Sequence, residues 1–346
     1  MANKRNPTIT GRILALIDVD ILKKRPTRLL WGALHCVVIC ISIGAIHSTK
    51  SFLLQIFFGV VIGHSLGVLS FLGHEILHGS VVGKGTLCSI LGGICFAHFG
   101  MLPSVWVKWH NNLHHRHTQN ALKDPDCFGY INGNYKYSRW YRILERFLPG
   151  SKTIQSYLFL FAGFSLQVVA IIFQRSDILK ITRERTLARC YFFTVYAGWF
   201  TCAIMAFGIA GICFCLVLPL MLANFLMMSY IATNHLLSPL SDEKPNPLWN
   251  TLTVRSPRWV EDLHLQFGYH VEHHFFPSAS PYYARHIRGV LLQIDPSMYM
   301  EMSHIKAIKH LYNTPRFYRD ESSLINPITK DVVGTLHSGH FGERIR

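Results

Sequence analysis

Long apolar runs without a charged residue constrain this chain more than any other feature of its sequence. The run from Phe52 to Gly73 contains neither proline nor a charged side chain and continues directly into His74. A helix of about 20 apolar residues spans the roughly 30 Å hydrocarbon core of a bilayer, because all its backbone hydrogen bonds are made within the helix. Half of the 346 residues are hydrophobic and only 15% are charged. The sequence therefore predicts a helical membrane protein.

The predicted fold is all-α and integral to the membrane, with four transmembrane helices arranged as two hairpins, interfacial helices, and a cytoplasmic cap that carries histidine clusters. We predict spans at about residues 29–46, 52–73, 191–210 and 212–232, and interfacial segments at 87–102 and 157–173. The first interfacial segment is short, is interrupted by glycines and ends at Pro103; the second contains Gln167 and is bracketed by basic residues. A full crossing by either segment would place the histidine clusters on opposite sides of the membrane.

Basic residues predict the orientation of the chain. Residues 1–28 carry seven lysines and arginines, whereas the connector at residues 47–51 carries only Lys50. The positive-inside rule places a basic N-terminus in the cytoplasm. We expect a basic cytoplasmic N-terminus at 1–28, a membrane domain at 29–280 and a cytoplasmic C-terminal tail at 281–346, so that both termini are cytoplasmic. The compact length and the absence of a recognisable retention tail favour a bacterial inner membrane over an endoplasmic reticulum.

The formal net charge of +15 is compatible with either nucleic acid or an anionic membrane surface. The lysines and arginines flank apolar segments and do not form a stripe interleaved with aromatic residues. The membrane surface is therefore the expected partner, and nucleic-acid binding is not expected.

Three clusters of histidine carry the chemistry. Their sequences are His74-Glu-Ile-Leu-His78, His110-Asn-Asn-Leu-His-His-Arg-His117 and His270-Val-Glu-His-His274, and His235 follows the last apolar run. On an α-helix, residues i and i+4 lie on one face, which suits one metal ion and predicts that His110 and His114 act together. His115 points about 100° away and can serve a neighbouring ion. Nine imidazoles could thus bind two metal ions: His74, His78, His110, His114, His115, His235, His270, His273 and His274.

Imidazole ligands suit iron, zinc, copper or nickel. The HExxH spacing of His74–His78 is also the signature of zinc metalloproteases, in which the glutamate is the general base. One zinc site would leave most of the clustered histidines unexplained. A non-catalytic metal-binding or transport protein would need ligands along its spans, whereas these clusters are predicted at one membrane face.

The three clusters resemble the histidine boxes of the membrane fatty acid desaturases and hydroxylases, over roughly residues 30–280. Trp109, the Asp124-Pro-Asp126 segment and the Phe275-Phe-Pro277 segment also match this family. The resemblance implies a di-iron centre with His235 as the additional ligand, dioxygen as co-substrate and two external electrons. It implies removal of two hydrogens from a fatty acyl chain, with no catalytic residue beyond the metal ligands.

The resemblance also sets the alternatives. A hydroxylase or ketolase acting on a lipid, sterol or carotenoid would use the same scaffold. Front-end desaturases usually carry glutamine where His270 stands, so that reaction is disfavoured. No His-Pro-Gly-Gly haem motif is present, so we expect electrons from a separate ferredoxin or cytochrome b5. Four residues are expected to support the ligands: Glu75, Glu272, His117 and Asn234, the last through a water. The acyl carrier, chain length, double-bond position and oligomeric state are left open.

Overall fold

The computed structural model describes residues 8–127, 143, 145–175, 178–241, 245–338 and 344–345. Residues 1–7 of the predicted basic N-terminus, and residues 339–343 and 346 of the predicted tail, lie outside this set. Among the described residues, four helical stretches are long and apolar enough to cross a membrane: Pro26–Ser48, Phe52–Leu77, Ile154–Phe173 and Thr182–Asn234. The chain is therefore a mostly helical membrane protein.

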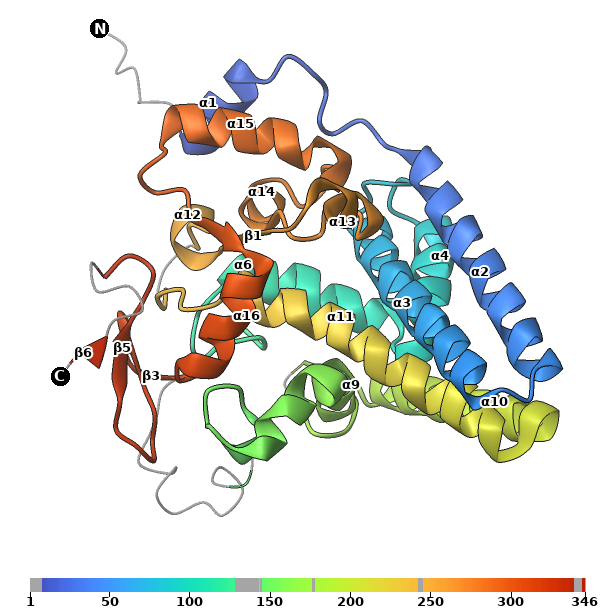
Figure 1. Cartoon of the computed structure of the whole chain (residues 1–346). Helices are drawn as coiled ribbons and strands as arrows, with labels where there is room; N and C mark the ends of the chain where they lie inside the picture. The colour runs from blue at the N-terminus through green and yellow to red at the C-terminus, as the bar shows by residue number, and fades with distance from the viewer. Residues whose placement is uncertain are drawn as a thin grey trace, which may run out of the picture.

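The helices α2 (Leu29–Ser48), α3 (Phe52–Leu77) and α11 (Leu218–Asn234) run side by side (Figure 1). The helix α10 (Thr182–Gly211) precedes the π-helical turn η5 (Ile212–Val217). The chain reverses direction at Gly208, whose φ of 61° favours glycine. The Trp199 indole N–H then donates to the backbone oxygen of Cys215 at 3.1 Å, which ties the two arms together.

Small residues let α3 approach α11 closely. One face of α3 carries a stripe of three glycines, Gly59, Gly63 and Gly67. This stripe packs mainly against leucine side chains of α11. A Cβ atom at Gly63 would lie 2.7 Å from Cβ of Leu222 and 2.9 Å from the backbone oxygen of Pro219. Such small-residue stripes allow dispersion contacts between helices in lipid. This contact fixes the position of the last turn of α3, where the first histidine cluster lies.

The predicted interfacial segments have different shapes. The first is α4 (Thr86–Phe96) with the 3-10 turn η2 (Ala97–Phe99), and it bends by 92° into the following helical stretch, which begins with α5 (Pro103–Trp106). The second is η4 (Ile154–Tyr157) followed by α9 (Leu158–Phe173), a straight stretch long and apolar enough to cross the membrane. The interfacial location of both segments stays a prediction.

The expectation of an all-α fold is wrong for the C-terminal part of the chain. Strand β1 (Thr253–Arg255) pairs in parallel with β2 (Glu301–Ser303). A second, antiparallel sheet has the order β3–β4–β5–β6, with strands Phe317–Asp320, Ser323–Ile325, Val332–Gly334 and Arg344–Ile345. Strands of two to four residues are too short for an alternating hydrophobic pattern to be recognised in the sequence.

The other elements of the C-terminal part are helical. They are α12 (Pro247–Asn250), α13 (Arg258–Leu263), α14 (His270–Phe275), η6 (Pro281–Tyr283), α15 (Ala284–Ile294) and α16 (His304–Asn313), and α1 (Ile9–Leu16) packs on α15. We call residues 245–338 together with α1 the cap. Arg288 of α15 forms an ion pair with Glu301 of β2.

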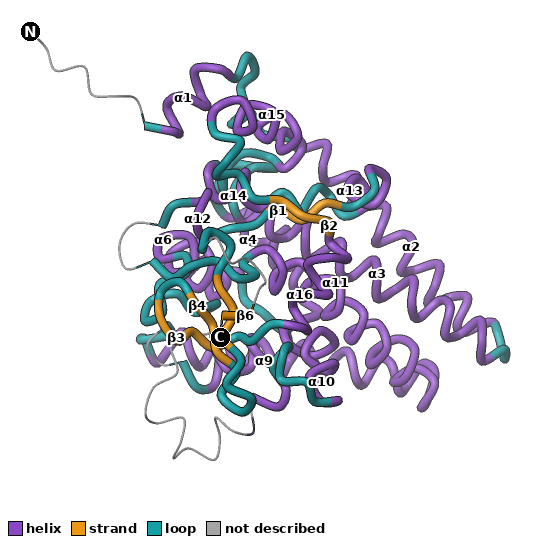
Figure 2. Tube along the Cα trace, turned by 60° about the vertical axis from the view of Figure 1, so that its left-hand side comes forward, coloured by secondary structure: helices purple, strands orange, loops and turns teal. Residues whose placement is uncertain are grey.

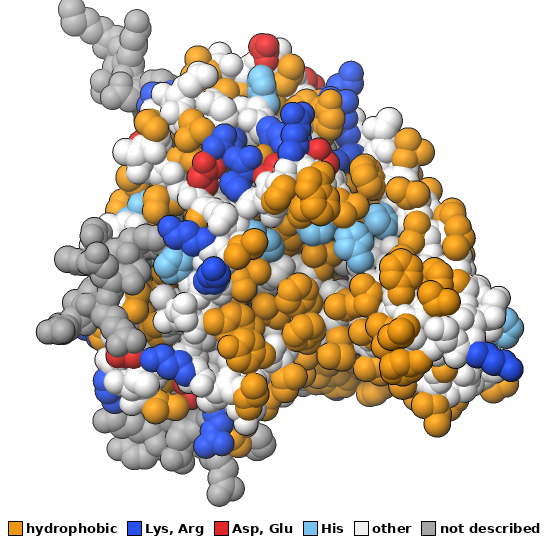
Figure 3. All heavy atoms as spheres, in the orientation of Figure 1, with side chains coloured by type: hydrophobic (Ala, Val, Ile, Leu, Met, Phe, Trp, Pro, Cys, Tyr) orange, Lys and Arg blue, Asp and Glu red, His pale blue; other side chains and the backbone are white. Residues whose placement is uncertain are grey.

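The cap is a folded part of the molecule and not a loose tail. Leu311, Tyr318 and Leu324 are buried in the same hydrophobic core as α3 and α11. On the face shown in Figure 3, hydrophobic side chains cover the region of α3, α10 and α11, whereas many charged side chains lie over the cap. The sheet of β3–β6 lies on the side of the molecule away from α2, whereas β1 and β2 lie beside α13 (Figure 2). The histidine clusters meet where the cap, which carries the third cluster on α14, packs against the apolar helices.

Candidate metal centre

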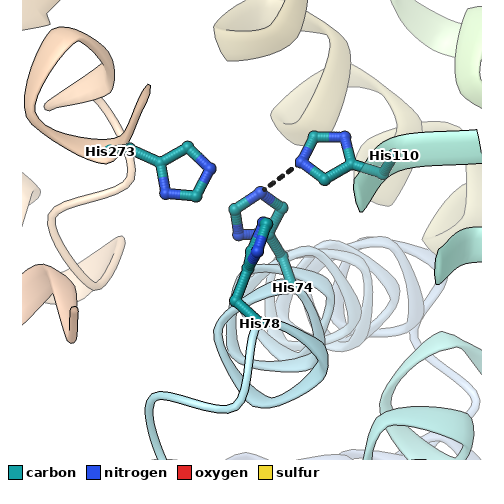
Figure 4. A group of neighbouring side chains, drawn as sticks. All are labelled: His74, His78, His110 and His273. Carbon is teal, nitrogen blue, oxygen red and sulfur yellow. Dashed lines mark hydrogen bonds between the residues drawn. The ribbon is translucent and has the colours of Figure 1, made fainter. Parts of the chain in front are cut away.

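The first histidine cluster ends α3. His74 occupies its last turn and His78 is its C-cap, so the two rings lie on one face with centroids 4.6 Å apart. Both side chains are buried. Figure 4 shows these rings pointing toward His110 and His273, which come from two other elements. The α-helical spacing predicted from the sequence therefore describes this cluster correctly.

The second cluster lies on a π-helix, η3 (Val107–His114), followed by α6 (His115–His117). The backbone N–H of His115 donates to the backbone oxygen of His110, so residues five apart stand above one another. The Nε2 atoms of His110 and His115 are 3.1 Å apart. His114 instead turns toward His235, with ring centroids 4.9 Å apart. His110 and His114 therefore fall into different four-histidine groups, although their ligand atoms still lie within 4.8 Å of each other and of a carboxylate oxygen of Asp126.

The third cluster, on α14, is shared between two groups of rings. His273 approaches the first two clusters, and its Nε2 atom lies 3.1 Å from Nε2 of His115. His270 and His274 face the other way, and their Nε2 atoms are 3.1 Å apart. Nε2 of His235, the residue after α11, lies 2.9 Å from Nε2 of His270.

Two groups of histidines thus have ligand atoms within 4.8 Å of one another. One group is His74, His78, His110 and His273, and the other is His114, His235, His270 and His274. His115 joins the first group through its contacts with His110 and His273. The groups adjoin, since the ring centroids of His115 and His274 are 4.4 Å apart. The structure brings all nine predicted ligands together.

The contacts among the rings fit two metal ions. Nε2 atoms converge at 2.9–3.1 Å, and Nε2 of His78 is buried without a hydrogen-bond partner among the described residues. Nitrogens at right angles around a metal with bonds of about 2.1 Å lie roughly 3.0 Å apart. Burial, together with neighbouring rings, holds the pKa values of His270, His273 and His274 well below the ordinary value. These rings are neutral and offer a lone pair.

The outward-facing nitrogens of the second group are held by residues that the sequence reasoning did not assign. Nδ1 of His114 donates to Oδ1 of Asp124 at 3.0 Å, and Oδ2 of Asp126 is 3.3 Å away. Nδ1 of His235 donates to the backbone oxygen of Asn250 at 2.9 Å. These contacts direct Nε2 of each ring toward the group. The Asp-Pro-Asp sequence after the second cluster was the only feature of the sequence that pointed to these supporting carboxylates.

Two of the four residues expected to support the ligands, both of them glutamates, have other partners. Glu75 accepts from Arg28 at 2.9 Å and from Ser280, and it bonds to no histidine among the described residues. Glu272 accepts from Thr253 at 2.7 Å and from Tyr299, and burial raises its pKa to about 7. Both carboxylates therefore connect segments of the fold beside the clusters.

His117 and Asn234 differ in their surroundings. His117 is partly exposed and lies outside both groups. Asn234 precedes His235 and is fully buried, and neither polar atom of its amide has a hydrogen-bond partner among the described residues. A buried amide without a partner is unfavourable, so Asn234 is suited to a water or another polar ligand beside the second group.

An apolar chamber adjoins both groups. Trp106, Phe164, Met227 and Phe267 line it together with histidines of the two groups. A second cavity, of about 240 Å³, is lined by α9, α11 and the cap. Asp126, Ile231 and His235 line both spaces, so the larger cavity leads to the second group.

Comparison with known families agrees with this geometry. The sequence model of the family described as "Fatty acid desaturase" matches residues 51–306, well over half of the chain. The matched region contains every histidine of the two groups. No curated protein matches the chain with significant similarity.

Proposed function

Because the chain belongs to the fatty acid desaturase family, we propose that it removes two hydrogens from a long-chain fatty acyl substrate at a di-iron centre. The observation that carries this proposal is the convergence of nine histidines into two adjoining groups beside an apolar chamber. Bound iron would supply dioxygen activation and hydrogen abstraction from an unactivated carbon, with two electrons from an external carrier.

In this proposal, the three clusters and His235 hold the two irons. Asp124 keeps the proton of His114 on Nδ1, and the Asn250 backbone oxygen does the same for His235, so Nε2 of each ring stays free for a metal. An imidazole that binds a metal is neutral and would add no charge of its own to the centre. Asn234 holds a water beside the second group through its buried amide.

The chamber positions the acyl chain. Trp106, Phe164, Met227 and Phe267 are all buried and surround the space next to the histidines, where they exclude water. Exclusion of water prevents side reactions of a strong oxidant. Holding one pair of carbons beside the centre determines which bond is oxidised, because proximity alone contributes much of the rate.

Electrons come from a separate ferredoxin or cytochrome b5 in this proposal. The chain carries a formal net charge of +15, which attracts acidic carriers and anionic lipids. The positive-inside rule supports a cytoplasmic N-terminus, and an even number of spans would put the C-terminus and the docking face on the same side.

The test measures metal content and lipid products of iron-supplemented cells that express the wild type, His114→Ala or His117→Ala. We expect about two irons per wild-type chain and a product lighter by two hydrogens. His114→Ala should lose iron and product, whereas His117→Ala is the matched control from the same segment outside both groups. A product heavier by one oxygen would identify the hydroxylase alternative. One zinc per chain, indifferent to His114, would refute the proposal in favour of a protease.

A further inference from the structure

The cavity that leads to His235 has a polar end formed partly by residues after the family match. This end is lined by Gln119 from the segment after α6, by Arg316, which immediately precedes β3, and by Tyr318 of β3. The match to the desaturase family ends at residue 306, so Arg316 and Tyr318 belong to a part of this chain that the family model does not cover. The segment lies in the strand region of the cap (Figures 1 and 2).

Arg316 is a buried cation with unused hydrogen-bonding capacity. Its side chain is 4% exposed, and Nη2 donates to the backbone oxygen of Thr314 at 2.9 Å and to the Thr314 hydroxyl. Its Nε atom has no partner among the described residues. None of the carboxylates among the described residues forms an ion pair with it. Burial lowers the pKa of Arg316 to about 10, because a charged guanidinium without an ionic partner is unfavourable away from water.

The remaining wall of the cavity is mostly apolar. Phe159 and Gly163 of α9, Met228 and Ile231 of α11, and Leu324 of β4 contribute to it. A space with apolar walls and a buried cation at one end fits an amphiphile with a hydrocarbon chain and an anionic end group. The shared residues Asp126 and His235 connect this space to the histidine groups.

We propose that Arg316 binds the anionic head group of the acyl substrate, a carboxylate or a phosphate, while the chain extends through the cavity toward His235. The identity of this ligand as the substrate rests on the proposed desaturase function. Anchoring the head group fixes the number of carbons between it and the metal centre. The position of the new double bond is then counted from the head group and not from the methyl end.

The test measures binding of three probes with the same C16 chain to purified wild-type protein in detergent above neutral pH: the free fatty acid, lysophosphatidic acid and the uncharged alcohol. We expect at least one anionic probe to bind about 10- to 100-fold more tightly than the alcohol, as a charge-assisted hydrogen bond predicts. Preference for the acid identifies a carboxylate, and preference for the phosphate identifies a phospholipid-like head group. Equal affinity for all three probes overturns the proposal.

Two variants test whether Arg316 causes the preference for anionic probes over the alcohol. Arg316→Leu should remove it without changing alcohol binding, and Arg316→Lys should retain part of it. Arg319→Leu is the matched control, because Arg319 lies three residues after Arg316 in β3, is exposed and pairs with Asp320. A folded Arg316→Leu protein with unchanged preference overturns the proposal. If that variant does not fold, the wild-type probe series and Arg316→Lys still decide it.

Product analysis separates this inference from the proposed function. Wild-type protein supplied with C14, C16 and C18 chains should place the double bond at the same distance from the head group. A constant distance from the methyl end overturns head-group anchoring while leaving desaturation established. Binding that depends on Arg316 without any desaturation refutes the proposed function and leaves the anionic site.

Discussion

The carboxylate of Asp124 supports the second histidine group, and Asp124→Asn tests this role at nearly constant shape. Asp124 is 6% exposed and accepts three hydrogen bonds: from Nδ1 of His114 at 3.0 Å, from the backbone N–H of Gln119 at 2.8 Å and from that of Asp126 at 3.0 Å. All three partners are donors. An asparagine offers only one acceptor oxygen, so its amide nitrogen must face a donor in either orientation.

The expected magnitude follows from this geometry. If the amide nitrogen faces the Gln119 N–H, a buried backbone donor loses its partner. If it faces His114, the ring must move its proton to Nε2, which removes the lone pair needed for a metal. Either orientation loses a charge-assisted hydrogen bond of about 1.5–3 kcal/mol, which corresponds to a roughly 10- to 100-fold loss of metal affinity.

Titration of iron-depleted protein with ferrous iron measures this loss directly. Asp295→Asn is the matched control, because Asp295 also accepts from a backbone N–H but lies in the loop after α15, away from both groups. We expect one of the two sites to weaken in Asp124→Asn and both to be unchanged in Asp295→Asn. Unchanged iron affinity of a folded Asp124→Asn protein would refute the argument that the carboxylate orients His114.

Three further predictions concern the scaffold. Gly63→Ala should destabilise the protein by about 1–3 kcal/mol through overpacking against α11. Gly44→Ala should leave the stability unchanged, since its Cβ would meet nothing within 4 Å. Thermal unfolding in detergent compares the two variants. Arg28→Leu should cost about 3–5 kcal/mol, measured in the same way, because it leaves the 1%-exposed carboxylate of Glu75 without its cation. The hydrogen bond from Arg288 lowers the pKa of Glu301 below its ordinary value of 4.5. The ion pair therefore stabilises the cap above pH 4.5, and this stabilisation is lost as the pH falls through the lowered pKa. The melting temperature of Glu301→Gln should therefore differ from wild type at neutral pH and converge with it in acid; a constant difference would contradict the assignment.

The membrane class and the set of candidate histidine ligands followed from local sequence. An apolar run such as 52–73 needs no partner to indicate a spanning helix, because lipid requires its backbone to be satisfied internally. The spacing of His74 and His78 is likewise a local property of one helix. Eight histidines named from spacing, and His235 named from its position after the last apolar run, converge in the structure.

Which metal group each ring joins was decided by tertiary structure. His115 lies above His110, with their Nε2 atoms 3.1 Å apart, because η3 is a π-helix and not the α-helix that the spacing suggested. The hydrogen-bond register of η3 depends on packing around the turn, which residue spacing alone does not encode.

The supporting contacts and the cavity also depend on residues far apart in the chain. Glu75 meets Ser280 across 205 residues, and Gln119 meets Tyr318 across 199. The sequence by itself determined which side chains could bind metal and which segments could enter lipid, because both depend on chemistry and short spacing. Only the tertiary structure decided how the rings are divided, which carboxylate orients a ligand and where a buried arginine closes the cavity, because these depend on contacts between segments that no local pattern relates.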